Sequence, residues 1–172
     1  SSVGRIFQDL RLIYDLTVIE NVMLAMKYNP TEKLFASILP QSLYKKQLDS
    51  INQKAESILE RFFLSDVRTS KADNISYGQQ KLLTLACCIA NDTNLLLLDE
   101  PVAGINQNYR EKITHILKEL KAEGKTIFLI EHNADFIEDV SDEIYFLDEG
   151  KIKEYDSLAH LKSDASVLEA YM

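Results

Sequence analysis

Two adjacent carboxylates, Asp99 and Glu100, follow a run of four leucines and precede Pro101. Four consecutive apolar residues that stop before a proline are typical of a short strand buried on both faces of a parallel sheet. The carboxylates then lie at the carboxyl end of the strand, where open α/β sheets bind their ligands. This position predicts a chemical role for the pair. The alternative is a strand that ends in a solvated acidic turn.

A second candidate site is the segment Ile-Ser-Tyr-Gly-Gln-Gln-Lys at residues 75–81, which opens a predicted helix. Small residues such as Ser76 and Gly78 let backbone N–H groups approach an anion, and the helix dipole adds partial positive charge. The alternative is that Asn74 or Ser76 only caps the helix. Taken alone the segment favours capping, whereas a leucine strand about fifteen residues later favours a phosphate site.

The elements that position these residues change character near residue 74. Residues 9–74 have helical periodicity, including a long amphipathic helix. Residues 75–158 alternate helix and strand, as in a parallel sheet with helical crossovers. We therefore predict a segment 1–8, a helical subdomain, one half of an α/β core, and a helical tail at 159–172. The core half should contain helix 78–91, the leucine strand, a helix with an apolar face, and strands 126–131, 143–147 and 151–155.

Composition and charge limit the classes of partner. Hydrophobic residues make up 46% and charged residues 27% of the 172 residues, as in ordinary globular domains. A net charge of -8 argues against a nucleic-acid partner held by a basic face. No apolar stretch is long enough to span a bilayer, so we expect membrane contact only through a partner. Cys87 and Cys88, adjacent in a predicted helix, are interpreted as buried small hydrophobes in a reducing cytosol.

The motifs resemble, in order, those of the ATP-binding cassette (ABC) family. The segment from Ile75 to Gln79 resembles its signature, and Leu95 to Glu100 resembles its Walker B strand. The other three resemblances are Arg5–Gln8 to the Q-loop, Ala103–Asn106 to the D-loop, and Ile130–His132 to the switch histidine. The resemblance covers the whole chain. It implies a P-loop NTPase-like α/β fold with a mainly parallel sheet and a helical subdomain.

Within this family the sequence motifs are most similar to those of the ATP-binding subunits of branched-chain amino-acid importers. The shared segments are Thr17–Asn21, Tyr77–Gln80, Ala103–Asn106 and Val167–Tyr171. Most cassettes have glycine where Tyr77 stands and aspartate where Asn106 stands, and both departures fit the importer subgroup. For Asn106 the alternative of a simple cap on the following helix stays open.

The resemblance implies roles in phosphoryl transfer, where the protein mainly positions water and neutralises charge. Asp99 would hold Mg²⁺, through a water molecule, and Glu100 would orient or deprotonate the attacking water. Gln8 would reach the same metal and water, and His132 would contact the γ-phosphate. The alternative for His132 is a surface histidine at a strand end.

The signature residues Ser76, Tyr77, Gly78 and Gln79 would serve the ATP bound by an opposite subunit, together with Asn106 of the D-loop. We therefore expect a homodimer or heterodimer of ATPase subunits. The surface near Gln8 and the helical subdomain would contact transmembrane permease subunits. The protein would then be cytoplasmic, peripheral on the inner face of the plasma membrane.

A phosphate-binding loop is the part of this family that the sequence lacks. No Gly-x-x-x-x-Gly-Lys-Ser/Thr motif occurs. The tripeptide Gly124-Lys125-Thr126 is preceded by Glu119 where the motif needs glycine, and we interpret Gly124 as a helix terminator.

We therefore expect that the chain is part of a longer protein, without the Walker A part, the phosphate-loop strand and the antiparallel β subdomain. The isolated chain should not hydrolyse ATP alone, and it should self-associate or rearrange to cover exposed apolar surface.

Three functions compete at this stage. The first is the ATP-hydrolysing subunit of an importer of branched-chain amino acids or similar polar solutes. The second is a non-catalytic interaction module that docks a permease or supplies the signature to a partner's ATP site. The third is a soluble cassette of translation or DNA repair, for which we would expect a tandem cassette or a coiled-coil insert, and the sequence shows neither.

Overall fold

The computed structural model describes residues 3–6, 12–26, 41–164 and 167, without the side chains of 3–6 and 41–47. The chain divides into two units, Ser1–Ile130 and Glu131–Met172. The boundary between them falls inside the predicted segment 75–158. No helix among the described residues is both long and apolar enough to cross a bilayer.

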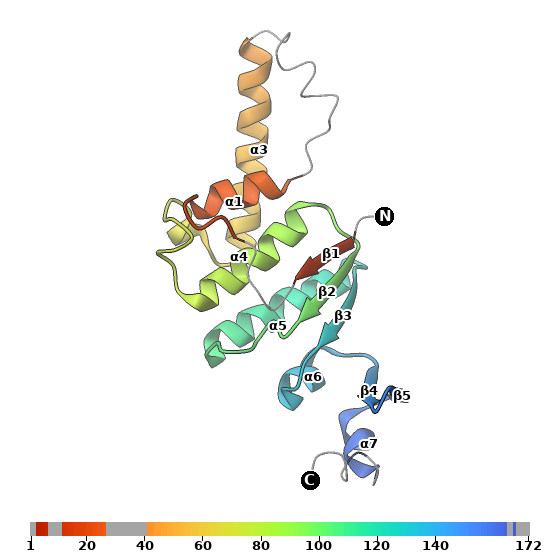
Figure 1. Ribbon diagram of the computed structural model, residues 1–172. Helices are drawn as coiled ribbons and strands as arrows, with labels where there is room; N and C mark the ends of the chain where they lie inside the picture. The colour runs from red at the N-terminus through yellow and green to blue at the C-terminus, as the bar shows by residue number, and fades with distance from the viewer. Residues whose placement is uncertain (1–2, 7–11, 27–40, 165–166, 168–172) are drawn as a thin grey trace. The chain divides into compact units, whose positions relative to one another are not determined.

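The first unit contains a three-stranded sheet in the order β1, β2, β3 (Figure 1). Its strands are β1 (Val3–Ile6), β2 (Leu95–Asp99) and β3 (Thr126–Ile130), and both pairings are parallel. The predicted parallel sheet is therefore confirmed, although β1 was not among the expected strands. Since all three strands run the same way, their carboxyl ends meet at one edge of the sheet.

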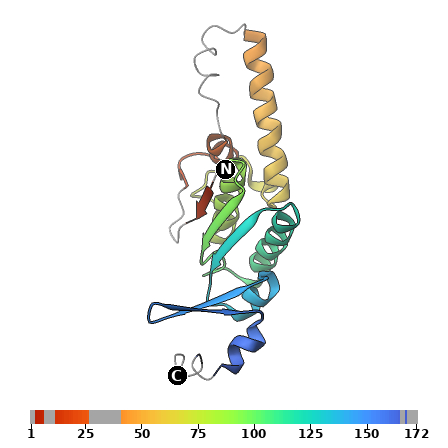
Figure 2. The same ribbon diagram turned by 90° about the vertical axis from the view of Figure 1, so that its right-hand side faces the viewer.

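Burial alternates along β2. Leu96 and Leu98 are buried, whereas Leu95 and Leu97 are half-buried. The expectation that the leucine strand is buried on both faces is therefore wrong for the described residues. Figure 2 shows α5 (Gln107–Ala122) along one side of the strands. An alternating pattern of burial is what a sheet covered by helices on one side produces.

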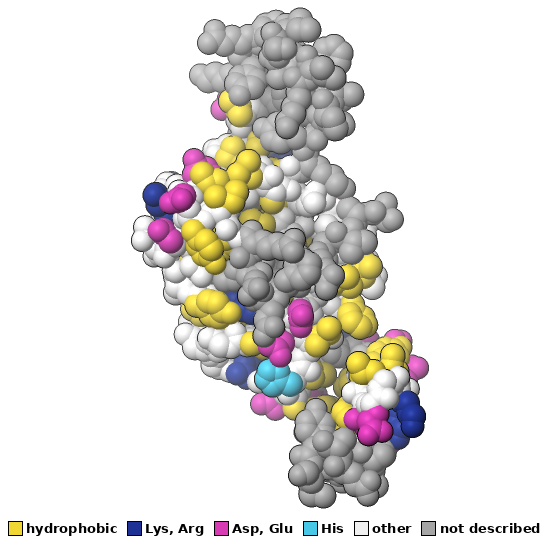
Figure 3. All heavy atoms as spheres, viewed as in Figure 1, with side chains coloured by type: hydrophobic (Ala, Val, Ile, Leu, Met, Phe, Trp, Pro, Cys, Tyr) yellow, Lys and Arg dark blue, Asp and Glu magenta, His cyan; other side chains and the backbone are white. Residues whose placement is uncertain are grey.

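On β3, Phe128 and Ile130 are 54% and 56% exposed. These two residues alternate along the strand, so they project from the same face of the sheet. Figure 3 shows hydrophobic side chains in several separate patches on the face that it presents.

The helical part of the first unit is formed by α1 (Val18–Ala25), α3 (Gln41–Arg61) and a 3₁₀ turn, η1 (Ser65–Val67). Helix α1 contacts both α3 and α4 (Tyr77–Ala90). The core between these helices consists of fully buried side chains, which include Val18, Val22, Ala55, Leu59 and Phe62. Their spacing of three and four residues is the amphipathic pattern that predicts the helices.

Helix α5 packs its apolar face inward, as predicted, and ends where the sequence indicates. The N–H of Gly124 donates to the carbonyl of Lys121 (2.9 Å), and the N–H of Lys125 donates to the carbonyl of Leu120 (3.1 Å). With Gly124 at φ +83°, these bonds form a Schellman motif. Gly124 is therefore the helix terminator, and the tripeptide that begins with it leads into β3.

The second unit contains α6 (Ala134–Val140), an antiparallel hairpin of β4 (Ile144–Asp148) and β5 (Lys151–Tyr155), and α7 (Leu158–Ser163). Strands β4 and β5 form their own two-stranded sheet. Both residues of the hairpin turn, Glu149 and Gly150, have positive φ, as tight two-residue hairpin turns require.

Candidate functional site

Asp99 and Glu100 lie at the carboxyl end of β2, the middle strand of the sheet, as predicted. Glu100 has φ +47°, a strained backbone conformation for a residue with a side chain. Its N–H donates to the carbonyl of Ile130 on β3 (2.9 Å). Its carbonyl accepts from Lys81 Nζ (2.8 Å) and from the N–H of Ala103 (3.2 Å). The backbone of Glu100 is thus held from both sides.

Helix α4 begins with a complete capping box. Ser76 Oγ accepts from the N–H of Gln79 (3.3 Å), and Gln79 Oε1 accepts from the N–H of Ser76 (2.9 Å). The alternative that Ser76 caps this helix is therefore correct, and the side chain of Gln79 takes part in the cap. Asn106 likewise caps α5, because its Oδ1 accepts from the N–H of Tyr109 (3.1 Å). Neither cap tests a role toward nucleotide.

Tyr109, which the sequence analysis did not single out, contacts the start of α4. Its hydroxyl lies 3.1 Å from Ser76 Oγ, in a hydrogen bond that either group can donate. A Cβ placed on Gly78 would lie 2.5 Å from Cγ of the Tyr109 ring. Gly78 therefore serves this close packing. Its neighbour Tyr77 packs on the D-loop, where a Cβ on Gly104 would lie 3.3 Å from Cε1 of Tyr77.

Lys81 is the other residue that sequence reasoning missed. It is only 5% exposed, although it carries a charge, and its Nζ lies 5.6 Å from the centroid of the Tyr77 ring. The sequence signals only the burial of Lys81 and not its partner, because Lys81 directly precedes the largely apolar run Leu-Leu-Thr-Leu-Ala at residues 82–86. A lysine at such a position needs a polar partner.

The other two predicted site residues are His132 and Gln8. The N–H of His132 donates to Glu131 Oε2 (3.1 Å), and the side chain of His132 is exposed in the second unit. Gln8 lies outside the described residues. The first unit thus brings together Asp99, Glu100 and the start of α4.

The two thiols on α4 are poor nucleophiles. Burial, together with the neighbouring thiol, raises the pKa of Cys87 to about 12, and burial raises the pKa of Cys88 to about 11. A thiol must be ionised to attack or to bind a metal. Both side chains are half-buried, so the prediction of fully buried cysteines is wrong, although the raised pKa values fit side chains without a reactive role.

The described residues form no group of three or more His, Cys, Asp or Glu side chains that could hold a metal ion. Magnesium at phosphate sites is commonly held by one or two carboxylates and completes its shell with phosphate and water. The half-buried Asp99 carboxylate at the edge of the sheet supplies that type of ligand. The donor chemistry thus fits magnesium held jointly with phosphate.

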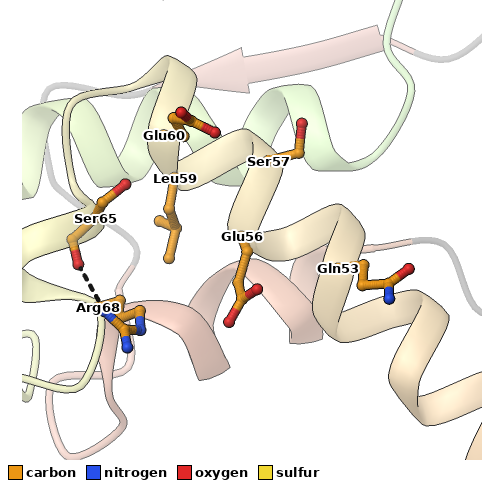
Figure 4. A pocket seen from close by; sticks show the side chains of 7 residues that line it. All are labelled: Gln53, Glu56, Ser57, Leu59, Glu60, Ser65 and Arg68. Atoms are coloured by element: carbon orange, nitrogen blue, oxygen red, sulfur yellow. Dashed lines mark hydrogen bonds between the residues drawn. The ribbon is translucent and has the colours of Figure 1, made fainter.

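A pocket on the helical part lies away from these residues. It has a volume of about 440 Å³ and lies beside α3 and η1 (Figure 4). Arg68 lies beside Ser65 at its edge and donates to the carbonyl of Ser65 (3.5 Å). The lining is Gln53, Glu56, Ser57, Leu59, Glu60, Ser65 and Arg68. None of the predicted site residues is among them.

The sequence is similar to a family model and to known proteins. A family model described as ABC transporter matches residues 1–103. The high-affinity branched-chain amino acid transport ATP-binding protein LivG of Salmonella typhimurium is 30% identical over 171 residues, which cover 99% of this chain and 67% of that protein. A probable LivG of Archaeoglobus fulgidus is 32% identical over 170 residues, 99% of this chain and 65% of that protein.

Solved structures give the same result. A nucleotide-free ATP-binding cassette from an ABC transporter matches with a TM-score of 0.77 and 29% identity, covering 99% of this chain and 68% of that chain. The ADP conformation of an ATP-binding cassette of an ABC transporter matches with a TM-score of 0.75 and 29% identity, covering 98% and 67%. The chain therefore belongs to the ABC transporter family, among its ATP-binding subunits.

Proposed function

We propose that the protein hydrolyses ATP to drive import of branched-chain amino acids or similar polar solutes through permease subunits. The observation that carries this proposal is the position of Asp99 and Glu100 at the carboxyl end of the middle strand, held against the start of α4. The solute class rests on relatives named for branched-chain amino acid transport. A site on the cytoplasmic face of a membrane follows from the permease partner.

In this proposal the chain positions water and phosphate. Magnesium, when bound, neutralises charge on the phosphates, and Asp99 would hold it from the end of β2. Glu100 would orient the attacking water or accept its proton. Gln8 would contact the same water and metal. His132, which follows β3, would bind the γ-phosphate.

The start of α4 would serve the nucleotide of an opposite ATPase subunit. Ser76, Tyr77, Gly78 and Gln79 are in the first turn or at the cap of this helix, where backbone N–H groups and the helix dipole favour anions. Asn106 at the cap of α5 would contribute to the same interface. Each composite site would then need two subunits.

A second candidate function, that of a non-catalytic interaction module, rests on a different observation. Residues 1–172 contain no Gly-x-x-x-x-Gly-Lys-Ser/Thr motif, and without such a loop a cassette has no cradle for its own phosphates. In this case the chain would dock a permease or supply the signature to a partner's ATP site.

The test measures Mg-ATP binding by calorimetry and ATP turnover by phosphate release. It uses the natural protein with any residues that adjoin these 172 and with its partner subunits. We expect Glu100→Gln to lower kcat by about 10²–10⁴-fold, the usual range for a general base, and to leave Mg-ATP binding unchanged.

The matched control is Glu149→Gln. Glu149 also has positive φ, at +45°, and lies in the exposed turn of the hairpin. Its replacement should leave kcat within about twofold of the wild type, because solvent-exposed substitutions outside a site have small effects. Absence of Mg-ATP binding by the wild-type protein would contradict the catalytic proposal and support the second candidate.

A further inference from the structure

Lys81 places a charged group beside the main chain of Glu100, the candidate catalytic residue. It lies on α4, one turn after Tyr77, and it is almost completely buried. Its Nζ donates to the main-chain carbonyl of Glu100 at 2.8 Å. A buried ammonium group is costly unless it gains strong hydrogen bonds. The cost indicates that the bond to Glu100 has a specific use.

The bond helps to hold the backbone conformation of Glu100. A residue with a side chain adopts φ +47° only when its surroundings hold it there. Ile130 on β3 accepts the N–H of Glu100, and Ala103 donates to its carbonyl from the turn that follows. Lys81 supplies the contact from α4, and it is the charge-assisted one. Removal of this contact would take a charge-assisted hydrogen bond away from a strained residue.

The same lysine joins the signature to this turn. Its ammonium group lies 5.6 Å from the centroid of Tyr77, whose ring packs on Gly104 at the other end of the turn. The start of α4 and the backbone of Glu100 are therefore connected through one side chain over less than two turns of helix.

We propose that Lys81 is a positioning residue, which fixes the backbone of Glu100 so that its carboxylate points at the attacking water. This inference rests on the proposed function, because it assigns Lys81 to the same hydrolytic step. A misplacement of about 1 Å in such a group can lower the rate about 100-fold. Lys81 would act on kcat more than on nucleotide affinity, because its ammonium group binds the main chain of Glu100.

Lys125 is a matched control, because it is a lysine that only supports the fold. Lys125 Nζ donates to the carbonyl of Thr93 at 2.7 Å, at the opposite end of the strands, where β2 and β3 begin. The bond has the same chemistry and nearly the same length as that of Lys81. Methionine replaces either lysine with an unbranched side chain of similar length and removes only the charged donor.

The experiment compares wild type, Lys81→Met, Lys81→Arg and Lys125→Met in the natural protein with its partner subunits. We expect Lys81→Met to lower kcat about 10–100-fold with KM for ATP within about threefold. Lys81→Arg keeps a charged donor and should recover a measurable part of the lost rate. Lys125→Met should keep both kinetic constants, even if its thermal stability falls as much as that of Lys81→Met.

Hydrogen exchange at the amide of Glu100 provides a readout that needs no turnover. The bond of this amide to Ile130 should open more often in Lys81→Met than in Lys125→Met at equal global stability. Equal exchange, unchanged kcat, or a rise in KM without a fall in kcat would each overturn the assignment. If the wild type does not hydrolyse ATP, the proposed function fails, and the exchange measurement alone decides whether Lys81 holds Glu100.

Discussion

Gly78, in the first turn of α4, is a position where one added methyl group should be costly. Its Cβ would lie 2.5 Å from Cγ and 2.8 Å from Cε2 of Tyr109. The ring is not free to swing away, because its hydroxyl contacts Ser76 Oγ at 3.1 Å and Lys112 Nζ lies 5.2 Å from its centroid. Overpacking of this kind typically costs about 1–3 kcal/mol, whereas alanine in place of a helical glycine gains at most about 1 kcal/mol. We therefore expect Gly78→Ala to lower the free energy of unfolding by about 1–2 kcal/mol.

Removal of the ring should reverse the sign of this effect. In a Tyr109→Ala background the new methyl group meets no ring atoms, and the gain in helix propensity remains. Gly78→Ala should then raise the free energy of unfolding by roughly 0.5 kcal/mol. Gly124→Ala is the control, because its Cβ would meet nothing within 4 Å but its φ is +83°. Its cost of about 1–2 kcal/mol should be the same in both backgrounds.

Urea unfolding of the chain, followed by circular dichroism, measures these free energies. The two single variants, the double variant and the wild type form a double-mutant cycle. We expect a coupling energy above about 1 kcal/mol between residues 78 and 109, and below about 0.5 kcal/mol between residues 124 and 109. A coupling between 78 and 109 as small as that of the control would refute the claim that Tyr109 limits residue 78.

Two further predictions concern titratable groups. Hydrogen bonds from Thr17 lower the pKa of Glu20 from its usual value of 4.5, so its contribution to stability is present above that pH and is lost as the pH falls through the lowered value. Urea midpoints should therefore fall less on acidification in Glu20→Gln than in wild type, and equal falls would contradict this. With pKa values of about 12 and 11, Cys87 and Cys88 should react with iodoacetamide at pH 8 at least about tenfold more slowly than in the unfolded chain. Equal rates of reaction in the folded and unfolded chain would contradict the prediction for the cysteines.

Local periodicity predicted the helices and most strands because each of these patterns is contained in one segment of chain. The buried face of α5, formed by Ile113, Ile116, Leu117 and Leu120, is fully visible as a 3.6-residue pattern. Strand β1 is only four residues long and gains its hydrogen bonds from β2, which lies more than eighty residues later. The burial of the second face of β2 likewise depends on what packs there. A run of leucines alone does not specify that neighbour.

For the site, sequence reasoning located the carboxylates correctly because topology places every parallel strand end at the same edge. It also held open the capping roles of Ser76 and Asn106, which the structure confirms. Lys81 and Tyr109 escaped notice because their partners lie 19 and 33 residues away in the chain. Contacts of this range produce no local pattern, and only the folded geometry identifies them.

The contacts around Glu100 all involve residues at or near the start of α4. Ser76 and Gly78 contact Tyr109 on α5, Tyr77 packs on Gly104, and Lys81 binds the carbonyl of Glu100. Each is a modest interaction, with a hydrogen bond worth on the order of 1 kcal/mol. Together they join the start of α4 to the stretch from Glu100 to the first turn of α5. A strained residue persists only where its surroundings over-determine it, and this cluster meets that requirement around Glu100. A ligand that engages the start of α4 would therefore act on residues that are already connected to the main chain of Glu100.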